Sequence, residues 1–329
     1  MKNINTVFNK IKKLKVGVIG DVMLDRYVWG EVERISPEAP IPIVSLKRKE
    51  NRIGGAGNVA LNCASLGAQV FVLSVLGKDD ESTILEQLFK EQGISTKYIS
   101  NSNNRITTTK TRIISRNQQM MRLDSEVTNE LNATDENNIL RRVKDFIIKE
   151  KPEVMIFEDY NKGVLTNKII EASISYCKEA GIITAADPKR KNFFSYKGVD
   201  IFKPNLKEVN EALNIIMDNP DLSQLKQVHA AISKLLNHKI SLITLSEKGI
   251  FWNNGKEAAI LTGYLRNIAD VSGAGDTVIA TASLMFAVTK NIATASVIAN
   301  IAGGLVCEEV GTIAIDRKKL LAECSILMK

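Results

Sequence analysis

Short apolar stretches alternate with amphipathic helical stretches along most of this 329-residue chain, and this alternation constrains the fold more than any other feature. Strand-like runs cover residues 15–20, 70–76, 154–157, 182–186 and 241–245. Helical patterns cover residues 56–66, 135–149, 167–180, 206–216, 222–236 and about 276–288. Because parallel strands need long crossovers, the alternation predicts an α/β fold with a mainly parallel central sheet and helices on both faces. Ligands bind at the carboxyl ends of strands in such sheets, so the residues after each strand are the candidates for a site.

A second group of β-rich segments does not fit the central sheet. Residues 27–35 and 41–46 flank Ser36-Pro-Glu-Ala-Pro40, and prolines at this density favour a flap over a central strand. Residues 105–116 alternate Thr and Ile with Lys110, Arg112 and Arg116, which places basic groups on one side of a ribbon. No repeat or long linker divides the chain, so we expect one domain over residues 1–329 with lid segments at about 27–46 and 105–116.

Composition excludes several functional classes. The chain lacks a run of about eighteen apolar residues and does not begin like a secretory signal, so we expect a cytoplasmic protein with no membrane partner. The net charge of +7 arises from 44 basic and 37 acidic residues that are interspersed, and aromatic residues make up only 5%. That pattern indicates a solvated surface and argues against a nucleic-acid partner. Four dispersed cysteines and two histidines disfavour disulfides, zinc sites and Ser-His triads.

The segment Asp270-Val-Ser-Gly-Ala-Gly-Asp-Thr277 combines small residues with a carboxylate where a helix begins. Gly273, Ala274 and Gly275 have little or no side chain, so their N–H groups can close on a phosphate beside the positive end of the helix. Asp276 can then take a proton from a hydroxyl that attacks this phosphate. An ordinary strand-to-helix turn, with Asp as a cap, is the simpler alternative, and the segment alone does not decide between them.

Two other junctions carry polar or glycine-rich residues. Asp21 follows the first strand, where a carboxylate either caps a turn or accepts hydrogen bonds from adjacent sugar hydroxyls. In Gly54-Gly-Ala-Gly-Asn58 the glycines either ease a bend into the next helix or let a polyol lie against bare backbone. In the second case the Asn58 amide would orient the polyol.

Asn205 and Glu208 place two oxygen-bearing side chains one helical turn apart. They suit either a capping box or the outer shell of a hydrated Mg²⁺ ion, and the neighbouring phosphate motif favours the second. Basic side chains near the same edge form a pool that can hold a phosphate already present on a substrate. This pool comprises Lys110, Arg112, Arg116, Lys162, Lys189, Arg190 and Lys191, and each alone is better explained as a surface charge.

Segments 54–58, 205–208 and 270–276 have the order and approximate spacing of motifs in the ribokinase-like carbohydrate kinases, and the chain resembles that family over almost its whole length. The resemblance implies a ribokinase-like fold, ATP and Mg²⁺ as cofactors, and Asp276 as the catalytic base beside an anion hole from Gly273, Ala274 and Gly275. For the substrate side it implies Asp21, Gly54, Gly55 and Asn58, to which we add Lys110, Arg112 and Lys162 from the basic pool. For the nucleotide side it implies Asn205, Glu208, Thr244, Ser246, Gly249, Gly273, Gly275 and Asn300, with Glu208 near Mg²⁺ through water. Asp270 and Ser272, with Gly311 as a further contributor, fall where relatives bind a monovalent cation such as K⁺.

Within that family, segments 20–27, 34–44, 108–112 and 118–124 most resemble the kinases of heptose 7-phosphates. This resemblance implies transfer of the ATP γ-phosphate to the anomeric hydroxyl of D-glycero-β-D-manno-heptose 7-phosphate, a step of ADP-heptose synthesis for lipopolysaccharide. Two-domain relatives carry a following nucleotidyltransferase domain, and the His-x-Gly-His motif of that domain does not occur here. Short exposed ribbons seek partners, so we also expect a homodimer formed through the lid.

Other functions remain open at this stage. A related kinase for another sugar phosphate or a nucleoside would share the same motifs, and so would a sugar-binding regulator that has lost catalysis. A dinucleotide-binding oxidoreductase should carry Gly-x-Gly-x-x-Gly after the first strand. Here Gly17-Val-Ile-Gly20 leads directly to Asp21, which argues against that class.

Overall fold

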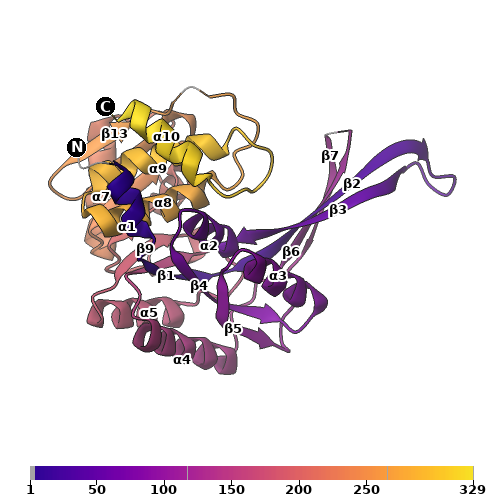
Figure 1. Cartoon of the computed structure of the whole chain (residues 1–329), viewed down its shortest axis with the longest axis horizontal. Helices are drawn as coiled ribbons and strands as arrows, with labels where there is room; N and C mark the ends of the chain where they lie inside the picture. The colour runs from indigo at the N-terminus through magenta and orange to yellow at the C-terminus, as the bar shows by residue number, and fades with distance from the viewer. Residues whose placement is uncertain (1–3, 117, 265, 329) are drawn as a thin grey trace.

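The computed structural model describes residues 4–116, 118–264 and 266–328, which form two β-sheets with helices packed around the larger one (Figure 1). Within these residues the large sheet has nine strands in the order β13-β12-β11-β10-β9-β8-β1-β4-β5. They are β1 (Lys15–Gly20), β4 (Gln69–Gly77), β5 (Ser95–Ser102), β8 (Val154–Glu158), β9 (Ile183–Asp187), β10 (Ile201–Phe202), β11 (Ile240–Thr244), β12 (Ile250–Asn253) and β13 (Ala258–Leu261). Neighbours from β5 to β11 are parallel, whereas β12 pairs antiparallel with β11 and β13. The predicted α/β fold with a mainly parallel sheet is confirmed.

Helices cover both faces of this sheet because alternate residues of a strand point to opposite sides. Val18 of β1 packs into one core, whereas the adjacent Ile19 packs into the other. The first core is covered by α1 (Ile4–Ile11), α2 (Ala56–Ser65), α3 (Asp80–Glu91), α8 (Ala274–Thr289), α9 (Ile292–Val306) and α10 (Arg317–Leu327). The second is covered by α4 (Ala133–Glu150), α5 (Asn167–Glu179), α6 (Leu206–Leu213) and α7 (Leu222–Leu236). Figure 1 shows α8 and α9 on one side of the sheet and α4 and α5 on the other.

The small sheet has the strand order β3-β2-β6-β7 and extends away from the helices (Figure 1). Its strands are β2 (Val22–Ile35), β3 (Pro42–Gly55), β6 (Thr109–Ser115) and β7 (Gln118–Ser125). The expected ribbons at 27–35 and 41–46 therefore lie in it, and of the expected ribbon 105–116 only residues 109–115 form a strand. Strands β2 and β3 are longer than expected, and β7 was not predicted as a strand. Residues 22–26 were not predicted as a strand, because the single residue Asp21 separates the end of β1 from the start of β2 and no turn signal marks the boundary.

Local signals located most helix ends. Residues 222–236 form α7 as expected, and Thr166 caps α5 by accepting a hydrogen bond from the Ile169 N–H at 3.3 Å. The helix expected over 206–216 ends at Leu213 instead, because Asn214 adopts a left-handed conformation with φ 53°. Across the described part of the chain, none of the helices combines the length and apolar character needed to cross a bilayer.

Candidate active site

The candidate site lies where the carboxyl ends of β1, β8 and β9 meet the N-terminus of α8. Asp276 is the third residue of α8 and is buried, with 5% of its surface exposed. Gly273 precedes the helix with φ 81°, and a Cβ atom there would lie 2.7 Å from Asn58 Nδ2. Both the backbone conformation and the close approach require glycine. The Ala274 N–H donates to the Val271 carbonyl at 3.3 Å and the Thr277 N–H to the Gly273 carbonyl at 3.0 Å, so Gly275 and Asp276 supply the free N–H groups at this helix start within the described chain. An anion hole from Gly273, Ala274 and Gly275 remains a prediction.

Two hydrogen bonds orient the carboxylate of Asp276. The Asn58 amide donates to Oδ2 at 2.7 Å and the Tyr160 hydroxyl donates to Oδ1 at 2.9 Å. Burial raises the pKa of Asp276 above its ordinary value, the hydrogen bond from Asn58 opposes the rise, and the charge of Asp187 adds to it. A carboxylate with a raised pKa is a stronger base than a solvated one, which suits proton abstraction. Sequence reasoning placed Tyr160 at a strand end but did not single it out.

Three carboxylates meet beside this base. Oxygen atoms of Glu158, Asp187 and Asp276 all lie within 4.8 Å of one another. Lys203 Nζ pairs with Asp187 Oδ2 at 2.7 Å, and Lys189 Nζ lies 3.6 Å from Asp187 Oδ1. Among the described residues, both oxygens of Glu158 and Oδ1 of Asp187 accept no hydrogen bond. Burial and the two neighbouring carboxylates raise the pKa of Glu158 well above its ordinary value. Buried oxygens that lack donors match the ligands that Mg²⁺ prefers, so this group fits a divalent cation.

Glu208, the residue predicted near Mg²⁺, has both oxygens engaged. Oε1 accepts from Lys189 Nζ at 2.8 Å, and Oε2 accepts from the Asn205 N–H at 2.8 Å. Asn205 Oδ1 in turn accepts from the Glu208 N–H, which completes a capping box for α6. Asn205 and Glu208 therefore form the capping box that was the alternative to a metal site, and a role of Glu208 near Mg²⁺ remains a prediction.

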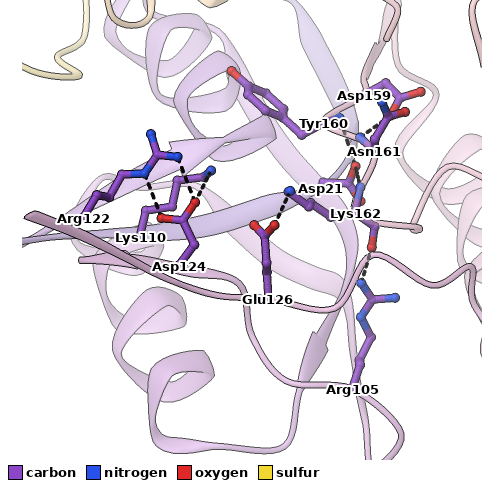
Figure 2. A network of polar contacts seen from close by, with 10 residues as sticks. All are labelled: Asp21, Arg105, Lys110, Arg122, Asp124, Glu126, Asp159, Tyr160, Asn161 and Lys162. Carbon is purple, nitrogen blue, oxygen red and sulfur yellow. Dashed lines mark hydrogen bonds and ion pairs between the residues drawn. The ribbon is translucent and has the colours of Figure 1, made fainter. Parts of the chain in front are cut away.

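Asp21 holds the loop that follows β8. Its Oδ2 accepts hydrogen bonds from the N–H groups of Tyr160 and Lys162, both at 3.0 Å, and its Oδ1 accepts from that of Val164 at 3.0 Å. Figure 2 shows Asp21 beside this loop, with Tyr160 and Lys162 projecting from it. Asp21 thus positions the loop that delivers the Tyr160 hydroxyl to Asp276, and its predicted contact with sugar hydroxyls remains a prediction.

Asp25 is a site residue that sequence reasoning missed. Its carboxylate is 4% exposed and accepts a hydrogen bond from Arg112 Nη1 at 2.5 Å through Oδ1. A Cβ atom at Gly54 would lie 2.3 Å from its Oδ2, and one at Gly55, where φ is 58°, would lie 2.4 Å from the Asp21 carbonyl oxygen. The two glycines are therefore needed beside these aspartates. The neighbouring sequence carries no periodic signal for Asp25, because the charged residues of 22–35 fall at 25, 26, 31, 33 and 34, and the residues that face Asp25 become known only from the strand register.

A cavity of about 770 Å³ opens beside the N-terminus of α8 and has the size of a nucleotide site. Six residues predicted for the nucleotide line it, namely Asn205, Thr244, Ser246, Gly249, Gly275 and Asn300. Ser246 has φ 57°, a left-handed conformation that glycine adopts more readily than serine. Much of the remaining wall is apolar, including Leu245, Ile250 and Val278, which suits a flat heterocycle.

The residues predicted for a monovalent cation are brought together next to the anion cradle. Asp270 Oδ1 accepts from the N–H and hydroxyl of Ser272 at 2.9 and 2.8 Å, and Oδ2 accepts from the Gly311 N–H at 2.9 Å. Burial opposes ionisation of Asp270, but these hydrogen bonds keep its pKa below the ordinary value. The group stays anionic, and the predicted cation role is left as a prediction.

The basic pool divides into two groups. Lys110, Arg112, Lys162 and Lys189 are partly buried and paired with carboxylates near the site. Arg116 and Arg190 are exposed, and Lys191 forms an exposed pair with Glu130 at 2.7 Å. Arg116, Arg190 and Lys191 are therefore solvated surface charges, which was the alternative for each residue of the pool.

A buried carboxylate at the start of a helix, beside a cavity of about 770 Å³, is an arrangement expected of a phosphate-transferring enzyme. The sequence profile of the pfkB family of carbohydrate kinases matches residues 13–319, and the chain belongs to that family. It is therefore a carbohydrate kinase, as predicted.

Two curated relatives are the bifunctional proteins HldE of Desulfatibacillum aliphaticivorans and Methylobacillus flagellatus. The first is 37% identical over 94% of this chain and 63% of its own length, and the second is 39% identical over 93% and 62%. The chain thus spans less than two thirds of these relatives.

Solved structures support the ribokinase-like fold. Arabidopsis thaliana ribokinase complexed with ribose and ATP is 21% identical, with a TM-score of 0.71, over 94% of this chain and 98% of that one. Phosphofructokinase-2 from Escherichia coli in complex with potassium is 17% identical, with a TM-score of 0.76, over 95% and 99%.

Proposed function

We propose that this protein transfers the γ-phosphate of ATP to the anomeric hydroxyl of D-glycero-β-D-manno-heptose 7-phosphate, giving the 1,7-bisphosphate and ADP. The observation that carries phosphoryl transfer is the buried Asp276 at the N-terminus of α8, held between Asn58 and Tyr160. The choice of a heptose 7-phosphate rests on the resemblance of the small-sheet segments and on the similarity to the HldE proteins. We place the reaction in ADP-heptose synthesis for lipopolysaccharide, and we treat residues 1–329 as one cytoplasmic kinase domain with the small sheet as its lid.

In the proposed reaction, Asp276 accepts the proton of the acceptor hydroxyl while the hydroxyl oxygen forms a bond to the γ-phosphorus. The bond from that phosphorus to the β,γ-bridging oxygen breaks, and ADP leaves. The N–H groups at the start of α8 offset the negative charge that develops on the transferred group. Both oxygens of Asp276 already accept one hydrogen bond each, so each retains a lone pair for the substrate.

The acceptor side is assigned to Asp25, Gly54, Gly55 and Asn58, with Asp21 supporting the loop after β8. Asp25 Oδ2 accepts no hydrogen bond within the described residues and lies against the bare backbone of Gly54, where a sugar hydroxyl can reach it. ATP is assigned to the cavity between Thr244 and Asn300. The substrate thus lies between the small sheet and the first turn of α8.

Two cations belong to the proposal. Glu158 and Asp187 would hold Mg²⁺, because both oxygens of Glu158 and Oδ1 of Asp187 are buried beside Asp276 and accept no hydrogen bond from the described residues. When bound there, Mg²⁺ would supply positive charge that offsets the charge of the ATP phosphates. Asp270, Ser272 and Gly311 would hold K⁺ next to the anion cradle.

A panel of acceptors tests the proposal. ADP release is measured with ATP and, in turn, heptose 7-phosphate, sedoheptulose 7-phosphate, fructose 6-phosphate, ribose and adenosine, and phosphorus NMR identifies the product. We expect the highest kcat/KM with heptose 7-phosphate and a new anomeric phosphate signal. Faster turnover of another acceptor would identify that acceptor as the substrate instead of heptose 7-phosphate. If no acceptor led to ADP release, the alternative of a sugar-binding regulator without catalysis would be favoured.

We further propose a homodimer formed through the small sheet. Met121 and Leu123 of β7 are 55% and 52% exposed, and the strand register puts them beside Ile113 and Thr111 on one face of that sheet. An exposed apolar face on a thin sheet is suited to a second copy of the chain. In light scattering, the wild type should have twice the mass of Leu123→Glu, whereas Ile148→Glu, which changes an exposed isoleucine of α4, should leave the dimer intact. A monomeric wild type at micromolar concentration would refute this arrangement.

A further inference from the structure

The face of the small sheet opposite Met121 and Leu123 carries a row of charged residues. The strand register aligns Asp25 of β2 with Lys110 of β6, and Lys110 with Asp124 of β7. In the next row, Arg112 of β6 lies opposite Arg122 of β7. Cross-strand partners share a face, so these side chains project from the same surface of the sheet.

Two carboxylates, Asp124 and Glu126, pair with three basic side chains, of which two lie on the sheet and one lies in the loop after β8. Asp124 accepts from Arg122 Nε at 2.9 Å and Nη2 at 3.0 Å, and it pairs with Lys110 Nζ at 3.5 Å. Glu126 Oε1 pairs with Lys162 Nζ at 2.7 Å. The side chains of Lys110 and Lys162 are only 17% and 15% exposed. Figure 2 shows the two amino groups pointing toward each other from the sheet and from the loop.

The same loop ties this cluster to the base. Lys162 is two residues from Tyr160, and Asp21 fixes the N–H groups of both. From this one loop the Tyr160 hydroxyl reaches Asp276, and the Lys162 amino group reaches Glu126. A substrate whose reacting hydroxyl meets Asp276 can therefore extend its far end toward Lys162 and Lys110.

We infer that Lys110, Arg122 and Lys162 bind the phosphate that the acceptor sugar already carries, so that this cluster selects phosphorylated over unphosphorylated sugars. The inference rests on the proposed function and deepens it by assigning the distal end of the substrate. Three cations face two carboxylates, and each lysine uses one of its three N–H donors in the contacts described, which leaves donors for a phosphate. A phosphate monoester carries about −1.5 to −2 charge at neutral pH and takes such donors strongly.

Arg112 has a different role from its neighbours. Its guanidinium donates to Asp25 and lies over the ring of Tyr27, with its central carbon 5.2 Å from the ring centroid. Through these contacts, Arg112 positions Asp25 against Gly54. It therefore belongs to the part of the site that holds the sugar ring, not the distal phosphate.

Titration calorimetry with D-glycero-D-manno-heptose 7-phosphate and with the same heptose lacking phosphate tests the inference without requiring turnover. We expect Lys110→Met and Lys162→Met each to weaken binding of the phosphorylated sugar by about 10- to 100-fold, the effect of losing a charge-assisted hydrogen bond. Binding of the unphosphorylated sugar should change less than about twofold. Lys110→Arg should restore most of the loss. The matched control is Lys47→Met on β3, an exposed lysine paired with Glu31, which should affect neither ligand.

Asp124→Asn separates a phosphate subsite from a purely structural ion pair. If the pair only stabilises the sheet, removing either partner should weaken both ligands alike. In a phosphate subsite, removing the carboxylate also removes a repulsive charge, so binding of heptose 7-phosphate should be retained or tightened. Equal losses of both ligands in Lys110→Met, or the same loss in Asp124→Asn as in Lys110→Met, would overturn the inference.

Failure of the proposed function has a distinct signature. If the wild type binds neither heptose but phosphorylates another sugar, the substrate assignment is wrong, and the variants are compared on fructose 6-phosphate and fructose instead. A selective loss on fructose 6-phosphate would still support the phosphate subsite. A wild-type enzyme that shows no preference for any phosphorylated acceptor would refute it whatever the sugar.

Discussion

The phosphoryl-transfer side and the acceptor side of this site are built in different ways. On the first side, the proposed cradle and base come from one continuous segment, residues 270–277, at the start of α8. On the second, Asp25, Lys110 and Asp124 come from three strands that only the register of the small sheet brings into one row. The difference teaches that a backbone anion site can be read from adjacent residues, whereas a side-chain site on a sheet depends on which strands pair.

The largest effect is expected on the phosphoryl-transfer side. Asp276→Asn preserves the shape of the side chain but removes the base, so kcat should fall by about 10²- to 10⁴-fold. Binding of ATP and of the acceptor, measured by calorimetry, should remain within a few-fold of the wild type. Near-normal turnover would exclude Asp276 as the base and would remove the distinction drawn between the two sides.

A methyl group at Gly273 should disturb the same side through the backbone. Gly273→Ala would place Cβ against Asn58 Nδ2 and displace a donor to Asp276, so kcat should fall by up to about 100-fold. Gly255→Ala is a matched control because Gly255 has a similar φ of 83° but no atom within 4 Å of the added Cβ. Both variants should lose about 1 kcal/mol of stability from the positive φ, and only Gly273→Ala should lose activity. Equal kcat values in the two variants would contradict the proposed role of the backbone around Gly273 in catalysis.

On the acceptor side, Asp25→Asn should act through binding. An amide can keep a hydrogen bond with Arg112 but is a weaker acceptor for a sugar hydroxyl, so the KM for the acceptor should rise about tenfold while the KM for ATP stays unchanged. Asp145→Asn, which alters an exposed aspartate paired with Lys149 on α4, serves as the control. A rise in the KM for ATP would show that the two sides are not separable in this way.

The smallest effect is expected from Tyr160→Phe. Tyr160 links the two sides, because Asp21 holds its N–H and its hydroxyl donates to Asp276. The Tyr160 hydroxyl lowers the pKa of Asp276, so its removal should raise that pKa further. The base must be ionised, so the acid limb of the profile of kcat/KM against pH should move to higher pH. The plateau should fall by only about 2- to 10-fold.

Tyr176→Phe on α5 is the control for Tyr160→Phe and should leave the profile in place. Burial raises the pKa of Tyr160 well above its ordinary value, so its hydroxyl stays protonated and able to donate at neutral pH. An acid limb that moves to lower pH in Tyr160→Phe would contradict the assignment of the base.

Much of the fold was predictable because its signals are local. The apolar periodicity located β1 and α7 with their observed bounds, and Thr166 located the start of α5. The lengths of β2 and β3 and the existence of β7 were not predictable, because these strands are half exposed and gain stability from pairing instead of from an apolar pattern.

The site divides in the same way. Residues 273–276 and six of the residues that line the cavity beside α8 were named from the sequence. Asp25 was missed, and Tyr160, Glu158 and Asp187 were placed at strand ends without a role. Asp21 illustrates the reason. Its position after β1 marked it as a site residue, but its three hydrogen bonds to the loop after β8 depend on a partner more than one hundred residues away in the chain.

The amino-acid sequence by itself determined the α/β architecture, the turn that opens α8 and the presence of a base within it. These features depend on residue types within a few positions of one another, since backbone conformation and helix ends are local properties. Only the tertiary structure decided which carboxylates meet around Asp276 and which basic groups form one row on the small sheet. Strand register and burial set those distances and pKa shifts, and both arise when distant segments pack together.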